Sequence, residues 1–431
     1  MSLTRLSLAL ALSLGAASSQ AQSATEQELM RRLDQLATEL NKVRAELGQL
    51  QQAQAAQAAQ AKVATAAVQP PPATLSSAEL PPAQPATVLS GYAELNYNRP
   101  SKSSKDASAD LRRLVLGYQH RFDEKTKVVA EIEVEHAVAS ADDAGEVAIE
   151  QAYIEHQLSP SLALHGGLFL MPMGLLNENH EPSAYLGVER NFVETAIIPS
   201  TWREGGLQLV ATLDNGLTLQ GGISTSFDLN KWDAGSSEGR ESPLGAIHQE
   251  MAQARSRDLA LFGAANWRGV PGLLLGASLF SGQATHKQTA VDSRITLWDV
   301  HARWTPGAWD LSGVYTRGSI SKTAQLNLPL VGGVTLIPSR FEGWYAQAGY
   351  KLWEQGSYAL TPFVRWEQFN TASRYADLGQ GLTPAVAPAE RVITLGANFQ
   401  LTPGVVFKAD WQRFRENSDL DRFNLGLGWS F

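Results

Sequence analysis

The sequence predicts an all-β transmembrane barrel of about 16 antiparallel strands, preceded by a short periplasmic helical coiled coil. Three observations lead to this fold class: a two-faced C-terminal strand, the lack of a long apolar helix after the N-terminus, and connections that alternate between short and long. In the last strand, small or polar residues occupy one face and apolar residues the other. The apolar face consists of Phe423, Leu425, Leu427, Trp429 and Phe431. Outer-membrane barrels commonly close on such a strand ending in Phe. A soluble β-sandwich, the alternative, explains neither the terminal Phe nor the number of strands.

Composition excludes several kinds of protein. The 431 residues carry a formal charge of −8 and no cysteine, which rules out disulfides, thiol catalysis and cysteine-zinc sites. The chain is not basic, so no nucleic-acid partner is expected. Beyond the N-terminal apolar run, no stretch of about 18 apolar residues would form a membrane-spanning helix. A barrel needs no such stretch, because only every second residue of a strand faces lipid.

The 8 histidines give no evidence of a catalytic or metal site. They are scattered, and none forms a close pair with another histidine or with an aspartate at the spacing of a metal or catalytic site. We therefore predict no catalytic residue, no metal and no cofactor, and we expect that the chain is not an enzyme. A triad assembled from distant strands is the remaining enzymatic alternative.

The N-terminus predicts a signal peptide over 1–21. Arg5 supplies a short positive region, Leu6 to Gly15 form an apolar run too short to cross a bilayer, and Ser19-Gln20-Ala21 fits a cleavage site. A short membrane anchor is the alternative, and the length of the apolar run argues against it.

A coiled-coil oligomerisation segment is predicted over 22–62. Apolar residues there alternate at spacings of four and three, which is the a/d pattern of a coiled coil: Leu29, Leu33, Leu36, Leu40, Val43, Leu47 and Leu50. A single amphipathic helix lying on the barrel or on another protein is the alternative. The Pro/Ala-rich stretch 63–87 cannot continue a helix and is predicted to be a linker. The barrel is predicted over 88–431.

Short turn sequences divide this barrel into its strands. There are seven such short connections, several of them Asn-Gly or Pro-Gly turns, and longer polar connections alternate with them. An even number of strands places both barrel ends on the short-turn, periplasmic rim. The predicted strands are 88–98, 111–122, 126–137, 146–157, 162–170, 205–213, 217–228, 256–268, 272–282, 292–304, 308–318, 340–352, 357–369, 390–402, 405–414 and 422–431.

The connection after the fifth strand, 171–204, is the longest and is predicted to fold inward and narrow the channel, with its apolar residues against the inner wall. An extracellular flap is the alternative. Charged residues on the strand faces opposite lipid are predicted to line the lumen. The pore-lining and constriction candidates are Arg112, Arg113, Arg121, Glu131, Glu133, Glu178, Glu181, Glu189, Arg190, Arg203, Arg303, Arg365 and Lys408.

Several motifs in 111–191 resemble the phosphate-selective porin family of outer-membrane channels. They are Leu111-Arg112-Arg113-Leu114-Val115-Leu116-Gly117, Gln151-Ala152-Tyr153-Ile154, Gly167-Leu168-Phe169-Leu170-Met171-Pro172-Met173-Gly174 and Glu189-Arg190-Asn191. The resemblance implies a homotrimer of sixteen-stranded channels that pass small anions, each with an N-terminal coiled coil. Phosphate selectivity in that family rests on a ladder of Arg and a cluster of Lys. This barrel departs from the pattern, since from Val88 onward it has 29 Lys and Arg against 37 Asp and Glu.

Taken together, the sequence predicts a porin of the bacterial outer membrane, with its coiled coil in the periplasm. It would be a passive diffusion channel for small hydrophilic solutes or ions, among which anions such as phosphate are candidates. Its expected partners are outer-membrane lipid, two further copies of the chain and the solutes that pass through. The alternative function is an envelope tether that is anchored by the barrel and acts through the coiled coil.

Overall fold

The structure is a computed structural model, which describes residues 42, 86–138, 140 and 144–431. The predicted signal peptide, the apolar seam of the coiled coil and residues 63–85 of the predicted linker lie outside the described residues, so these segments stay predictions. The last residue of the predicted linker, Thr87, is instead the first residue of the first strand. By its internal contacts the remainder of the chain, Gln84–Phe431, is one compact unit.

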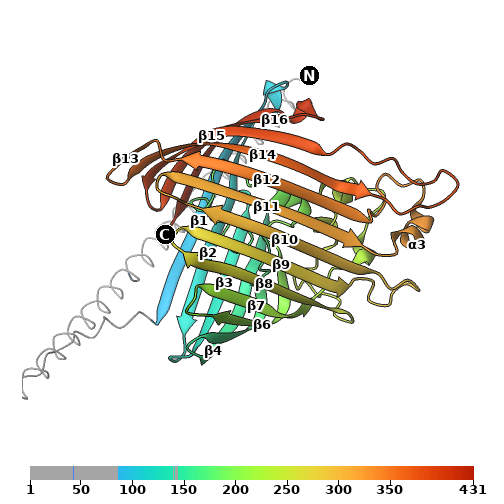
Figure 1. Cartoon of the computed structure of the whole chain (residues 1–431), viewed down its shortest axis with the longest axis horizontal. Coiled ribbons are helices and arrows are strands. Elements are labelled where there is room, and N and C mark those ends of the chain that lie inside the picture. The colour runs from blue at the N-terminus through green and yellow to red at the C-terminus, as the bar shows by residue number, and fades with distance from the viewer. Residues whose placement is uncertain (1–41, 43–85, 139, 141–143) are drawn as a thin grey trace, which may run out of the picture. The chain divides into compact units, whose positions relative to one another are not determined.

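This unit is a closed antiparallel β-barrel (Figure 1). Consecutive strands are hydrogen-bonded neighbours, and β1 also pairs with β17, so the sheet has no free edge. The strands are β1 (Thr87–Pro100), β2 (Ser108–Arg121), β3 (Thr126–Glu135), β4 (Glu146–Ser159), β5 (Leu162–Leu170), β6 (Arg203–Thr212), β7 (Leu217–Thr225), β8 (Leu259–Val270), β9 (Leu273–Gln283), β10 (Arg294–Trp304), β11 (Trp309–Ile320), β12 (Arg340–Tyr350), β13 (Trp353–Gln355), β14 (Tyr358–Arg374), β15 (Glu390–Thr402), β16 (Val405–Phe414) and β17 (Arg422–Ser430).

The barrel wall contains 16 strands, as predicted. The three-residue strand β13 continues β12, because both pair with β14 along the same edge, with a register shift of one residue between them: Gly349 lies opposite Phe363, and Trp353 lies opposite Leu360. The predicted strands 162–170, 390–402 and 405–414 agree with β5, β15 and β16 at both ends. The largest shift is at the end of β14, which continues to Arg374 instead of residue 369.

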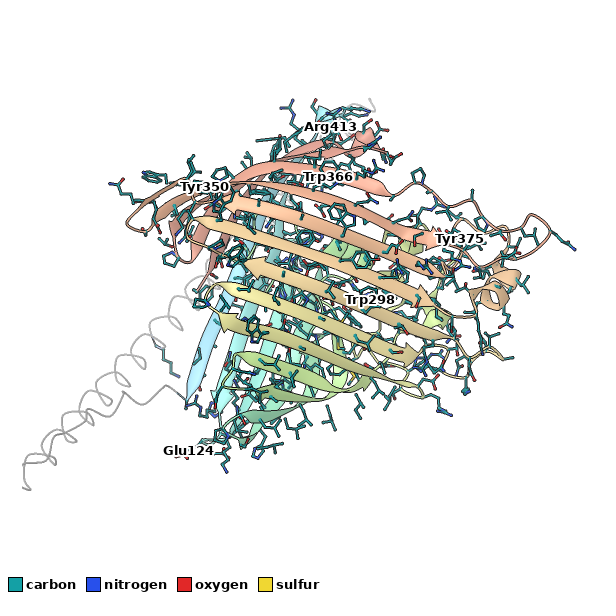
Figure 2. All side chains as sticks on the ribbon, in the orientation of Figure 1. Glu124, Trp298, Tyr350, Trp366, Tyr375 and Arg413 are labelled. Atoms are coloured by element: carbon teal, nitrogen blue, oxygen red, sulfur yellow. The ribbon has the colours of Figure 1, made fainter. Side chains whose placement is uncertain are left out.

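The two rims of the barrel differ in their connections. The seven predicted short turns all join consecutive strands at one rim, whereas the connections at the other rim are long and contain α3 (Thr323–Asn327) (Figure 1). Figure 2 shows Glu124 and Tyr350 at the short-turn rim and Tyr375 at the long-loop rim. Both ends of the barrel lie at the short-turn rim, where the Gly91 and Phe431 backbones exchange hydrogen bonds of 3.1 and 2.9 Å.

The strands present apolar side chains outward and polar ones inward over much of the wall. In β17, Phe423 and Leu425 are exposed on the outside, and Asn424 between them is fully buried. In β14, Trp366 is exposed between the buried Arg365 and Glu367. This alternation suits a surface in contact with lipid, because the backbone polar groups are satisfied within the sheet and only alternate side chains meet the membrane.

A hydrophobic core fills part of the barrel interior. It joins inward-facing residues of β5 and β8–β12 to residues of the long loops 171–202 and 226–258, including Trp202 and Phe227. Loop 226–258 contains η3 (Leu229–Lys231), α2 (Glu238–Glu241) and η4 (Gly245–Ile247). No helix in the described part of the chain is long and apolar enough to cross a membrane.

Candidate functional site: the constricted lumen

Loop 171–202 lies across the lumen, as the sequence predicted. Its backbone amides donate hydrogen bonds to side chains on strands from different parts of the wall. Gly174 N donates to Asp299 Oδ2 on β10 at 3.1 Å, Phe192 N donates to Glu367 Oε2 on β14 at 2.6 Å, and Val188 N donates to Asp410 Oδ2 on β16 at 2.6 Å. An extracellular flap would not reach all of these strands, so that alternative is wrong.

Buried carboxylates hold the loop in this position. Asp299, Glu367 and Asp410 are each at most 2% exposed. Within the loop, Glu194 accepts from the Leu175 and Leu176 amides at 2.5 and 2.8 Å. A loop inside a barrel has no strand partners for its amides, and a carboxylate accepts them with charge-assisted hydrogen bonds. These four acids therefore stabilise the constriction and do not present free negative charge to water.

Small residues on β17 let the loop approach the wall. A Cβ atom at Gly428 would lie 2.3 Å from the Cβ of Pro182, and one at Gly426 would lie 3.1 Å from Val188 Cγ1. The sequence predicted that this small face of the last strand meets water. The structure corrects the reason for its size: the small residues make room for loop 171–202.

An ion-pair network continues along the wall beside the loop. The Arg113 guanidinium lies 3.1 Å from Glu133, 3.7 Å from Glu94 and 3.9 Å from Glu135. Arg113, Glu94 and Glu133 are all buried, at most 5% exposed. A buried arginine surrounded by carboxylates is held in a fixed position, since its fork of donors satisfies several acceptors at once.

The loop's own ionisable residues extend this network. Arg190 donates to Ser200 Oγ at 2.6 Å and to Thr201 Oγ1 at 2.8 Å. His180 Nδ1 donates to the Asn177 backbone carbonyl at 2.8 Å, and its Nε2 lies 3.6 Å from the fully buried Glu150. Burial lowers the pKa of His180 to about 4, and the nearby Arg190 acts in the same direction. His180 is thus neutral at physiological pH.

Three cavities lie around the loop. The outer cavity, about 300 Å³, is in the half of the barrel toward the long-loop rim and is lined by Glu94, Asn98, Arg112, Arg113, Tyr185, Glu189, Arg190, Phe192, Thr195, Ser200 and Arg422. The inner cavity, about 380 Å³, lies against β8–β12; its charged lining residues are Glu178, Arg268, Arg303 and Arg365, with His301 beside them. The rim cavity, about 420 Å³, opens among the short turns and has Arg303, Asp310 and Lys351 as its charged residues.

The structure brings most of the predicted candidates to these cavities. Arg112, Arg113, Glu189 and Arg190 line the outer cavity, and Glu178, Arg303 and Arg365 line the inner one. Glu189 accepts from Asn98 Nδ2 at 2.8 Å, and Arg303 forms a two-pronged pair with Asp310 at 2.8 and 3.1 Å. The predicted set therefore describes two chambers of one lumen.

The remaining candidates lie elsewhere on the wall or loop. Glu133 pairs with Arg113 as described, Glu131 accepts from Gln151 at 2.6 Å, and Lys408 is buried behind Tyr185. Glu181 is exposed on the loop, and Arg203 pairs with Glu250 of loop 226–258 at 3.1 Å. Arg121 lies at the short-turn rim beside Asp123 and Lys127, away from the three cavities.

Sequence reasoning missed several residues of the site. Glu94, Glu150 and Arg422 were not predicted, although each has the inward position on its strand. Tyr185 was noted only as an apolar loop residue. A bulge between Glu94 and Leu95 in the β1–β2 pairing turns both Arg112 and Arg113 toward the lumen. Strict alternation cannot show this, because a bulge changes which residues face inward.

Comparisons with known proteins agree on the fold. No protein-family model matches the sequence. An uncharacterized protein of Aquifex aeolicus (strain VF5) is 29% identical over 356 residues, which cover 80% of this chain and 79% of that protein. Among solved structures, OmpF of Salmonella typhi in complex with daunomycin matches with a TM-score of 0.57 and 14% identity, over 80% of this chain and 97% of OmpF.

A second solved structure, the outer-membrane channel DcaP of Acinetobacter baumannii, matches with a TM-score of 0.50 and 15% identity, over 80% of this chain and 97% of DcaP. The chain thus has the sixteen-stranded barrel fold of outer-membrane porins. The prediction of a porin barrel is confirmed at the level of this fold, and the expectation that the chain is not an enzyme stays a prediction. Membership of the phosphate-selective family stays a prediction.

Proposed function

We propose that the barrel is a passive channel of the bacterial outer membrane that conducts small hydrophilic solutes and prefers anions to cations. The observation that carries this proposal is the charge of the three cavities. The outer cavity has four Arg against two Glu, the inner cavity three Arg against one Glu, and the rim cavity one Arg and one Lys against one Asp. Each chamber is net positive, so an anion meets a favourable potential on both sides of the loop.

The net charge of the whole barrel does not contradict this preference. Many of its acidic residues are removed from the lumen water, either as acceptors for the loop backbone, like Glu367 and Asp410, or as partners of buried Arg113. The arginines lie on the cavity walls instead. Arg112, for example, is about 4.0 Å from Asp110 and still half exposed to the outer cavity.

Arrangement in the membrane follows from the two rims. We infer that the short-turn rim faces the periplasm, because outer-membrane barrels have short periplasmic turns and long outer loops. A solute from outside then enters the outer cavity, passes loop 171–202 and leaves through the inner and rim cavities. The proposal includes assembly as a homotrimer, supported by the coiled-coil pattern of 22–62, and phosphate remains one candidate within the anion class.

The test is the reversal potential of the purified protein in a planar bilayer under a KCl gradient. We expect discrete conductance steps with a reversal potential of the sign for chloride preference. Replacing Arg112 and Arg422 by Gln should move it toward zero, because the outer cavity loses two of its four positive charges. Arg413→Gln is the matched control: it removes the same charge from β16 on the outward, exposed side of the wall (Figure 2). A cation preference of the wild type would contradict the proposal, and block by added phosphate would narrow the anion class.

A further inference from the structure

Tyr185 occupies a special position among the cavities. It lines the outer, the inner and the rim cavity, and in the described residues it is the one side chain that the outer cavity shares with the other two. The residue is only 6% exposed. The path from outside to the short-turn rim is therefore divided at this ring, with a net positive chamber on each side.

Two strands hold the Tyr185 side chain in place. Its hydroxyl donates to Glu94 Oε2 on β1 at 3.0 Å. The backbone on either side is fixed by Asn398 on β15, whose Nδ2 donates to Tyr185 O at 3.1 Å and whose Oδ1 accepts from Gly187 N at 3.1 Å. The hydroxyl also lies 3.4 Å from the Val188 carbonyl of the same loop, so the bond to Glu94 is the one that ties the tip of the ring to the barrel wall.

Behind the ring lies a buried ammonium group. Lys408 Nζ is 3.5 Å from the centroid of the Tyr185 ring, and Lys408 is 4% exposed. Among the described residues, this Nζ has no hydrogen-bond acceptor. Glu94 and Asp410 supply opposite charge nearby, but a buried ammonium without an acceptor is costly even when it rests on an aromatic face. A buried ammonium group of this kind calls for an explanation by function.

We propose that Tyr185 is the gate between the outer and the inner chambers and that its displacement uncovers Lys408 as an additional anion-selecting charge in the passage. The ring in its present position separates the chambers and hides the ammonium. A rotation that breaks the bond to Glu94 joins the cavities and places Lys408 on the wall of the joined path, where water and a passing anion satisfy it. This inference rests on the proposed anion channel and adds the residue that sets its narrowest point.

The first test is chemical and does not depend on ion currents. The folded protein in detergent is treated with a small water-soluble N-hydroxysuccinimide ester, and lysine acylation is mapped by peptide mass spectrometry. We expect Lys408 to be protected in the wild type, with the exposed Lys351 of the rim cavity as the internal positive control. Tyr185→Ala should increase the Lys408 acylation rate at least about tenfold, because the ring no longer excludes the reagent. Tyr185→Phe keeps the ring but lacks the bond to Glu94, so Lys408 should be acylated at a rate between those of the wild type and Tyr185→Ala.

The second test is conductance. Tyr185→Ala should raise the single-channel conductance roughly twofold and shift the reversal potential further toward anion preference, because the passage is wider and carries one more positive charge. Adding Lys408→Met, which is of similar length but neutral, should keep the higher conductance and remove the shift. Folding of each variant is checked by heat-resistant β-structure, and Tyr185→Leu, which keeps apolar packing without a ring, replaces an alanine variant that fails this check.

The outcomes separate the two proposals. Wild-type conductance together with a protected Lys408 in Tyr185→Ala overturns the gate. Higher conductance with a protected Lys408 overturns the uncovering of the charge. A cation-selective wild type overturns the anion channel, but the labelling of Lys408 still decides whether Tyr185 covers it.

Discussion

The two sides of the barrel interior have opposite characters. Against β8–β12, inward-facing residues such as Phe262, Phe280 and Phe341 are packed in the hydrophobic core with loop residues. Around β14–β17 and β1–β2, inward-facing residues are ion pairs and cavity walls, such as Arg365 with Glu367 at 2.8 Å. Both sets occupy equivalent inward positions on their strands. An inward position on a strand therefore shows only that the side chain points into the barrel. The loop packed against that part of the wall decides whether the side chain lies in the hydrophobic core or beside a cavity.

Loop 226–258 makes this difference. It brings Phe227, Trp232 and Ile247 to the core, and Trp232 Nε1 donates to the Thr335 carbonyl of loop 321–339 at 3.1 Å. These contacts join the long loops over β7–β12 into one packed layer. Solute is left with the opposite side of the lumen, where the outer cavity lies, and with the short-turn ends of β8–β12, which line the inner cavity. Loop 171–202 belongs to both sides, because Ile197 and Ile198 are in the core and Arg190 faces the cavity.

The largest expected effect on the hydrophobic core of the interior comes from Trp202→Ala. Trp202 is fully buried and its ring lies 4.9 Å from the rings of both Phe227 and Phe280. Loss of this side chain should lower the free energy of unfolding by about 4 kcal/mol, measured by denaturant titration in lipid or detergent. Trp366→Ala, on the lipid-facing side of β14, is the matched control and should change it by less than about 1 kcal/mol. Equal effects of the two variants would argue against a packed interior.

Glu194→Gln tests how loop 171–202 is held between the hydrophobic core and the cavity side of the interior. Glu194 accepts four hydrogen bonds, from the Leu175 and Leu176 amides, from Asn191 Nδ2 and from Tyr345 Oη, the last two at 2.8 and 2.9 Å. The neutral amide keeps the shape but places an NH₂ group among donors, which should cost about 2 kcal/mol. We also expect faster protease cleavage within 171–202. Unchanged cleavage would mean that the wall contacts alone hold the loop.

The pH dependence of the free energy of unfolding tests the cavity side of the interior. Burial lowers the pKa of His180, a loop residue, to about 4, below the value near 6.5 of an unfolded histidine. A proton therefore binds the unfolded chain more readily than the folded one. The stabilising contribution of neutral His180 to the free energy of unfolding is complete above about pH 6.5 and is lost progressively as the pH falls toward 4. His180→Gln should flatten the stability curve in this window by about 2 kcal/mol. A curve of the same slope would show that His180 is not buried as neutral imidazole.

The smallest expected effect comes from substitutions of Arg422, which should change the reversal potential and leave the free energy of unfolding unchanged. Arg422 donates from Nε to Gln412 Oε1 at 2.7 Å and lines the outer cavity. Arg422→Lys keeps one positive charge but loses the planar fork, so the reversal potential should stay near that of the wild type. Arg422→Gln removes one of the four arginine charges at this cavity. This single change should shift the reversal potential by roughly a few millivolts. A larger shift for the lysine variant than for the glutamine variant would show that geometry, and not charge, selects the ion.

Much of the wall could be predicted from the sequence, since the strands carry their own alternation and several of the short turns have a Pro-Gly or Asn-Gly sequence. The inward fold of 171–202 was also predicted, from its length and its apolar residues. The electrostatics were not. A count of acidic residues treats Asp410 and Glu367 as lumen charges, whereas in the structure they accept loop amides, and Arg112 and Arg422 are partly exposed on the wall of the outer cavity. Nor did any local pattern show that loop 226–258 would fill half of the interior, because that depends on contacts between loops far apart in the chain.

The seam between β1 and β17 has a consequence for biogenesis. The ring is completed by the pairing of the first strand with the very last one, down to the backbone of Phe431 itself. Each wall strand between these two pairs with strands adjacent in sequence, whereas β1 keeps one unsatisfied edge until β17 is in place. Disruption of β17 alone would therefore leave the sheet with two open edges and a strong tendency to aggregate.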